Sequence, residues 1–141
     1  MRGRPDYRVL DHPSDLLIEV RARTPEDLFA DAAVALCREI AGRVPPPGTR
    51  DHVLDASGFD AGNLVVRWLS ALIPLVYDDG LLVTGFSAMD VRPDRARGMA
   101  RVLPWRDAGF PPRLEVKAVT YHALTVRLTP GDSLLRVLFD L

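Results

Sequence analysis

The groups in this 141-residue sequence that could do chemistry are a few charged side chains near its two ends. Asp140 and Leu141 end the sequence, so the Asp140 side chain stands beside the terminal carboxylate of Leu141. Together with Asp15, they would supply hard oxygen ligands of the kind that Ca²⁺ or Mg²⁺ accept. Clustered carboxylates repel one another unless a cation, Arg or Lys neutralises them. The alternative interpretation is a solvated chain end, because the sequence alone does not bring Asp15 next to Asp140.

Lys117 is the one lysine in the sequence, and all other members of its Lys and Arg count of 18 are arginines. It lies within residues 114–122, where apolar and polar side chains alternate and β-branched residues favour a strand. Two interpretations stay open. Lys117 is an amphipathic stem on the solvent face of the strand, or it holds a positive charge beside a site.

His12 and His122 are two of the three histidines in the sequence. The sequence contains no HxxxH or CxxC spacing that would support a zinc site. From their spacing alone, we interpret both as structural or surface residues.

The composition argues against several classes of function. The net charge is −1, whereas a chain that grips nucleic acid by its phosphates needs clustered Lys and Arg. A protein partner is therefore favoured over direct binding of RNA. The sequence has no Gly-rich phosphate loop, GxSxG elbow or nucleophile–base pair, so it lacks the apparatus of a self-sufficient enzyme. Because no apolar run reaches the ~18 residues of a membrane span and no signal peptide is apparent, we expect a cytoplasmic protein.

The elements that must position these groups are short strands and two helices. Alternation and turn residues predict strands at residues 7–10, 16–22, 51–56, 81–86, 98–103, 114–122, 124–128 and 134–139. Thr24 caps a first helix that ends at Gly42. Asp60 caps a second helix over residues 61–78, which Pro74 should kink or bring to its last turn. This order predicts a single α+β domain over residues 1–141: a mostly antiparallel β-sheet with two α-helices packed on one face.

Three blocks of the sequence resemble the archease family. They are DHPSD at residues 11–15, EVKAVTYH at residues 115–122 and VLFDL at residues 137–141. The blocks stand in the family's order and span nearly the whole chain. The fold that this resemblance implies is likewise a sheet with two helices.

The resemblance also implies an acidic metal site. Its ligands would be Asp15, Asp140 and Leu141 through its terminal carboxylate, and its ion would be Ca²⁺ or Mg²⁺/Mn²⁺. His12, Lys117 and His122 would be supporting or partner-contact residues. The sequence departs from the family at residues 13–14, where Pro-Ser replaces the usual Thr-Ala, and at residues 102–110, which lack the usual Gly-Glu pair and His. These departures bear on the strength of the site.

The function that the resemblance implies is accessory, not enzymatic. Archease-like proteins assist the RtcB-type RNA ligase in tRNA splicing and RNA repair, where they promote its GTP-dependent guanylylation and multiple turnover. The chain would meet RNA only through the ligase. Two alternatives are a chaperone-like binding module for an RNA-modifying enzyme such as a tRNA methyltransferase, and a metal-dependent hydrolase that uses the carboxylates directly. The sequence leaves the identity of the ion, the RNAs concerned and the oligomeric state open.

Overall fold

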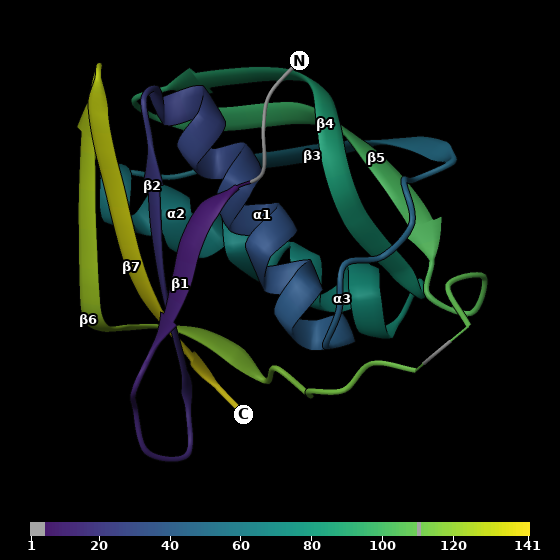
Figure 1. Cartoon of the computed structure of the whole chain (residues 1–141). Coiled ribbons are helices and arrows are strands. Elements are labelled where there is room, and N and C mark those ends of the chain that lie inside the picture. Colours follow the sequence, from purple (N-terminus) through teal and green to yellow (C-terminus); the bar gives the residue numbers. More distant parts are fainter. Residues whose placement is uncertain (1–4, 110) are drawn as a thin grey trace.

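The computed structural model describes residues 5–109 and 111–141. Within these residues, the strands form two sheets in which every pair of neighbours is antiparallel (Figure 1). The first sheet has the order β1-β2-β7-β6, and the second has the order β3-β5-β4. The strands are β1 (Asp6–Leu10), β2 (Leu16–Ala22), β3 (Arg50–Ser57), β4 (Leu81–Arg92), β5 (Arg95–Pro104), β6 (Ala118–Thr129) and β7 (Asp132–Asp140).

The helices lie between the two sheets. Helix α1 (Pro25–Ala41) contacts β2 and β7 of the first sheet and β4 of the second, and α2 (Ala61–Ser70) contacts β6 and β3. The short α3 (Leu72–Tyr77) follows α2. The predicted α+β class is confirmed, with one difference: the strands make two sheets, and the main helices cover the inner face of each.

Helix α1 has the boundaries that its sequence predicts. Thr24 has extended backbone, and its hydroxyl accepts a hydrogen bond from the Asp27 N–H at 3.0 Å. At the other end, Gly42 adopts a left-handed φ of 75° that glycine tolerates without steric cost. Between these caps, nearly every apolar side chain is buried, because the helix meets a sheet on either side.

The second predicted helix is divided in two at Ala71. Pro74 has no N–H to donate to the carbonyl of Ser70, so the i→i−4 ladder cannot continue through this point. The structure accordingly ends α2 at Ser70 and begins α3 at Leu72. Trp68 of α2 is fully buried, and its indole N–H donates to the Phe29 carbonyl at 2.9 Å, which fixes α2 against α1.

The predicted strand over residues 114–122 is wrong in its boundaries. Strand β6 begins at Ala118 and runs to Thr129, whereas residues 113–117 form no strand. A bulge interrupts β6 between Thr120 and Thr125, and Ala123 within it has a positive φ of 58°. Figure 1 shows β6 bending sharply beside the lower ends of β2 and β7. His122 therefore lies in a bend and does not end a strand.

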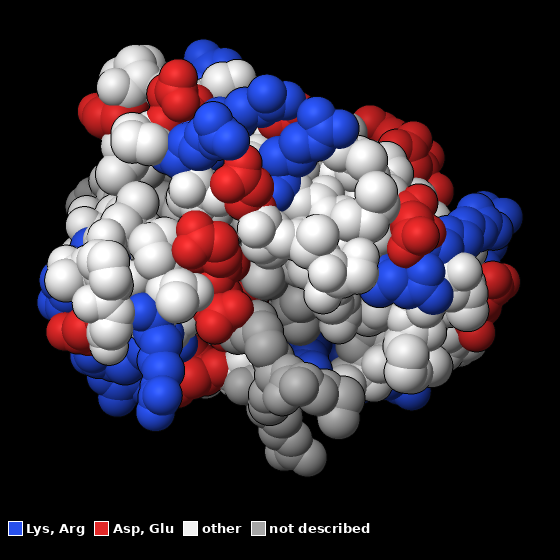
Figure 2. Space-filling view, turned by 90° about the horizontal axis from the view of Figure 1, so that it is seen from above, with Lys and Arg blue, Asp and Glu red and all other residues white. Residues whose placement is uncertain are grey.

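The surface carries both signs of charge. Figure 2 shows basic and acidic side chains interspersed over the upper face, with uncharged areas between them. This view agrees with the net charge of −1. Among the helices that the structure describes, none is both long and apolar enough to span a membrane.

Candidate metal and partner site

Asp15 and Asp140 lie at the same end of the first sheet, where β2 begins and β7 ends. We call this end, with Asp15, Asp140 and Leu141, the acidic edge. Strands β2 and β7 pair in an antiparallel register that includes Leu16 opposite Phe139. Asp15 directly precedes Leu16 and Asp140 directly follows Phe139, so both carboxylates lie where β2 begins and β7 ends. Figure 1 shows the β1–β2 turn and the C-terminus at the same lower end of the molecule. Two acidic residues that are far apart in the sequence thus lie at the same end of this sheet.

This edge is open to solvent. Phe139 is buried in the core, so the alternation of side chains along β7 directs Asp140 toward the opposite face. The side chain of Asp15 is 27% exposed, Asp140 is exposed, and Leu141 is 38% exposed. A partner could therefore reach these carboxylates.

Lys117 is tied to the edge through its backbone. Its N–H donates a hydrogen bond to the Asp140 carbonyl oxygen at 2.8 Å. Its side chain is exposed, and within the described part of the chain its ammonium forms no ion pair. The backbone of Lys117 therefore lies beside that of Asp140, and no described acidic side chain pairs with the Lys117 ammonium.

His12 and His122 meet beside Asp15. Their rings pack edge to face, with the ring centroids 6.2 Å apart. The Nδ1 atom of His12 lies 3.7 Å from Oδ2 of Asp15, which is too long for a hydrogen bond. That nitrogen is sealed from solvent and has no hydrogen-bond partner among the described residues. A buried polar atom without a hydrogen-bond partner destabilises the fold. A further polar group at this position, or a small movement of His12 toward Asp15, would give Nδ1 a partner.

Two residues with strained backbone lie close in the sequence to His12 and His122. Ser14 and Ala123 are the non-glycine residues with positive φ among those described, at 64° and 58°. Ser14 lies in the turn that carries His12 and Asp15, and Ala123 follows His122 directly. Strained backbone of this kind concentrates at functional sites, where it fixes side chains in place.

Carboxylate oxygens are the donors that Ca²⁺ and Mg²⁺ prefer, whereas structural zinc sites are built mostly from Cys and His. The described residues contain no group of three or more His, Cys, Asp or Glu side chains arranged to hold a metal ion. Asp15 and Asp140 each carry a carboxylate at this end of the sheet, and Leu141 follows Asp140. Ca²⁺ and Mg²⁺ take six or more oxygen ligands, many of them water, so such a set leaves positions for water or a partner's groups.

Tyr77 is a supporting residue that the sequence analysis missed. Its hydroxyl donates to the Leu114 carbonyl at 2.7 Å and accepts from the Val116 N–H at 2.8 Å. These bonds hold the segment that leads into Lys117. The signal in the sequence was a tyrosine at the end of an otherwise apolar helix, since a buried hydroxyl needs a partner.

Comparison with known proteins identifies the family. The family model described as "Archease protein family (MTH1598/TM1083)" matches residues 7–141. The chain belongs to the archease family. It is 31% identical to "Protein archease" of Methanopyrus kandleri over 138 residues, which cover 96% of this chain and 99% of that protein. It is 27% identical to "Protein archease" of Sulfolobus acidocaldarius over 137 residues, which cover 96% and 98%.

A solved structure has the same fold. The solution structure of Methanobacterium thermoautotrophicum protein 1598 superposes with a TM-score of 0.73 and covers 96% of this chain and 98% of its own. The two sequences are 22% identical, so this likeness concerns the fold alone. Membership of the archease family supports an accessory role in RNA processing.

Proposed function

We propose that this chain is an accessory protein of an RtcB-type RNA ligase and promotes the GTP-dependent guanylylation and multiple turnover of that ligase. The chain would act in the cytoplasm, in tRNA splicing and RNA repair. It would carry out no catalysis itself and would meet RNA only through the ligase. Membership of the archease family supports this proposal.

The observation that supports the proposal is the register between β2 and β7, which pairs Leu16 with Phe139 and so puts Asp15 and Asp140 at the same end of the sheet. The edge formed there is acidic, open and next to Leu141. An open carboxylate edge is suited to presenting a divalent ion to the phosphate groups of a partner's nucleotide.

Each residue at the edge would have its own role. Asp15, Asp140 and the Leu141 carboxylate would hold the ion, Ca²⁺ or Mg²⁺/Mn²⁺, and the bound ion would offset negative charge at the ligase's nucleotide site. His12 would orient the Asp15 carboxylate, because its unpartnered Nδ1 needs to move by less than an ångström to reach about 3 Å from Oδ2. Lys117 would lower the repulsion between the carboxylates.

His122 would contact the partner. It is exposed in the β6 bend and packs against His12, so a surface that covers His122 would also hold His12 in place.

Ligation turnover by a purified RtcB-type ligase, with GTP and Mn²⁺, tests this function. We expect the wild-type chain to raise turnover, and Asp15→Ala, Asp140→Ala and deletion of Leu141 each to abolish the increase. Leu141→Ala should keep it, because the terminal carboxylate remains. Asp132→Ala removes an exposed carboxylate at the other end of β7 and is the matched control.

Circular dichroism of each variant confirms that the fold is kept. Full stimulation by the Asp15, Asp140 and Leu141 variants would discard the metal mechanism and keep the ligase partner. If the wild-type chain did not stimulate, the accessory function would be contradicted, and a metal-independent, chaperone-like binding module would take its place.

A further inference from the structure

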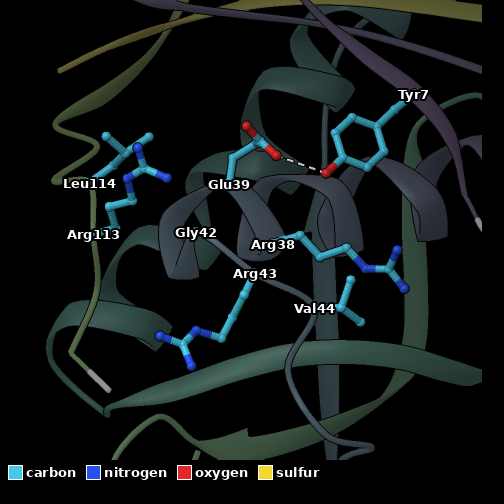
Figure 3. Close-up of a pocket in the computed structure, with 8 residues that line it drawn as sticks. All are labelled: Tyr7, Arg38, Glu39, Gly42, Arg43, Val44, Arg113 and Leu114. Carbon is cyan, nitrogen blue, oxygen red and sulfur yellow. Dashed lines mark hydrogen bonds between the residues drawn. The ribbon is translucent and has the colours of Figure 1, made fainter. Parts of the chain in front are cut away.

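A pocket at the C-terminal end of α1 is lined by three arginines, none of which belongs to the acidic edge. Its volume is about 370 Å³, and its lining includes Arg38, Arg43 and Arg113 together with Glu39 and Tyr7 (Figure 3). Arg38 and Glu39 belong to the last turn of α1, and Arg43 follows its end. Arg113 comes from the segment before β6, and Tyr7 comes from β1. We call this the arginine pocket.

Positive charge exceeds negative charge in the arginine pocket. Glu39 is the one acid among the described residues that line it, and it accepts a hydrogen bond from the Tyr7 hydroxyl at 2.8 Å. Burial, together with the Glu39 carboxylate, raises the pKa of Tyr7 to about 12, so the hydroxyl stays protonated. A neutral group therefore partners the acid, and an excess of positive charge remains.

Among the described residues, no acceptor takes a hydrogen bond from the guanidinium groups of Arg38 and Arg113. Nor do these groups form an ion pair within the part of the chain that the structure describes. By contrast, Arg95 is paired with Asp55 at 2.7 Å. Each guanidinium carries five N–H donors in a planar fork, a geometry that matches the oxygen atoms of a phosphate.

The three guanidinium groups stand at separate points around the pocket. Figure 3 shows Arg38 on the same side as Tyr7, and Arg43 and Arg113 on the other side. A ligand with one anionic centre could not contact all three. A ligand whose negative charge is spread over two or more adjacent phosphate groups suits such separated guanidinium groups better.

The backbone holds Arg113 in place. A Cβ atom on Gly42 would lie 2.6 Å from Cδ of Arg113, so the glycine lets this side chain cross the helix end closely. The N–H groups of Arg113 and Leu114 both donate to the Ile40 carbonyl, which anchors the segment to α1. The segment that carries Arg113 is therefore held against the end of α1 without a ligand.

We propose that the arginine pocket binds a ligand with two or more adjacent phosphate groups. Such a group occurs in nucleoside di- and triphosphates and, as successive phosphates, at the end of an RNA chain. The pocket binds it through the charge-assisted hydrogen bonds of Arg38 and Arg113, with Arg43 adding positive charge. This binding does not depend on the proposed ligase partnership.

Inorganic pyrophosphate, titrated into the isotope-labelled chain and followed by NMR, tests the proposal. We expect the side-chain Nε–H signals of Arg38 and Arg113 and the amide of Gly42 to shift. The double variant Arg38→Gln, Arg113→Gln should weaken binding by about tenfold or more, the loss expected for charge-assisted hydrogen bonds. Arg92→Gln is the matched control, since Arg92 is an exposed arginine of the β4 hairpin paired with Asp90.

Titrations with GTP and with a short 5′-phosphorylated RNA distinguish the two sources of the group, and tighter binding of one identifies it. The proposal is overturned if millimolar pyrophosphate, GTP and RNA all leave the Arg38 and Arg113 signals unmoved, or if the double variant binds as tightly as the wild type. If the double variant does not fold, the shifts of the Arg38 and Arg113 signals in the wild-type titration still test whether the pocket binds the ligand. No ligase is present in this assay, so its result is separate from that of the ligation assay.

Discussion

Tyr77 and Leu114 are joined by a hydrogen bond of 2.7 Å from the tyrosine hydroxyl to the leucine carbonyl, and the same hydroxyl accepts from the Val116 N–H. Tyr77 is the last residue of α3, so that helix holds the segment that runs from Arg113 in the arginine pocket to Lys117 at the acidic edge. Burial raises the pKa of Tyr77, which keeps its proton in place. One hydroxyl group thus supports both candidate sites.

We predict that Tyr77→Phe destabilises the fold by about 1–3 kcal/mol, because it leaves a backbone donor and acceptor without a partner. Chemical denaturation measures the loss, and hydrogen exchange should show faster exchange of the Val116 amide. Tyr121→Phe is the comparison variant: its hydroxyl accepts one hydrogen bond, from Asn63, whereas the Tyr77 hydroxyl makes two, so we expect a smaller loss. Equal effects of the two variants would contradict this account.

Glu19 should make stability depend on pH. It is 2% exposed, and hydrogen bonds from Arg136 and Arg8 lower its pKa from 4.5 to about 2. A lowered pKa means that the folded state prefers the charged carboxylate, so the stabilisation is present above pH 4.5 and is lost as the pH falls toward 2.

Glu19→Gln should therefore cost about 1–3 kcal/mol of unfolding free energy at pH 7, and the difference from wild type should shrink below pH 4.5. Urea denaturation across the pH range measures it. The exposed Glu115→Gln serves as the control. A difference that stays constant down to pH 2 would show that the charge of Glu19 is not its cause.

Ala123→Gly should stabilise the fold. Ala123 has a φ of 58°, where an alanine costs about 1–2 kcal/mol and a glycine costs nothing sterically. The greater flexibility of glycine in the unfolded chain offsets part of this gain, so we expect a net of up to about 1 kcal/mol. Ala118→Gly, in the same strand but without a positive φ, should destabilise. Thermal and chemical denaturation of both variants give the signs, and destabilisation by Ala123→Gly would contradict the strain.

Metal binding should raise the melting temperature of the isolated chain, because an ion that binds only the folded state stabilises it. We expect Ca²⁺ or Mn²⁺ to raise it for the wild type and for Asp132→Asn, and to have no effect on Asp15→Asn or Asp140→Asn. Differential scanning calorimetry with and without each ion measures the shift. An equal shift in all four proteins would place the ion elsewhere.

The features that the sequence predicted well are local ones. Thr24 and Asp60 both cap helices as expected, because a cap needs only a side-chain oxygen and an N–H three residues away. Asp15 and Asp140 could be named as candidates on their chemistry, but their placement at the same end of the sheet depends on the pairing of β2 with β7. That pairing joins residues far apart in the sequence, as the Arg136–Glu19 hydrogen bond shows.

The start of β6 was misplaced for a related reason. Leu114 and Val116 alternate with polar residues as they would in a strand, yet their backbone groups bond to Ile40 and to the Tyr77 hydroxyl. The pattern of apolar residues predicts which side chains are buried, and Val116 is indeed buried. It does not predict which partner takes the backbone hydrogen bonds.

The position of β7 in the first sheet affects the order in which that sheet can form during synthesis. This last strand is an inner strand of its sheet, between β2 and β6, so the hairpin of β1 and β2 has no neighbour in the sheet until β7 exists. Synthesis proceeds from the N-terminus, and domains generally fold in that direction as they emerge. The β1–β2 hairpin of this protein therefore keeps an open edge until β7 has been made and can pair with β2.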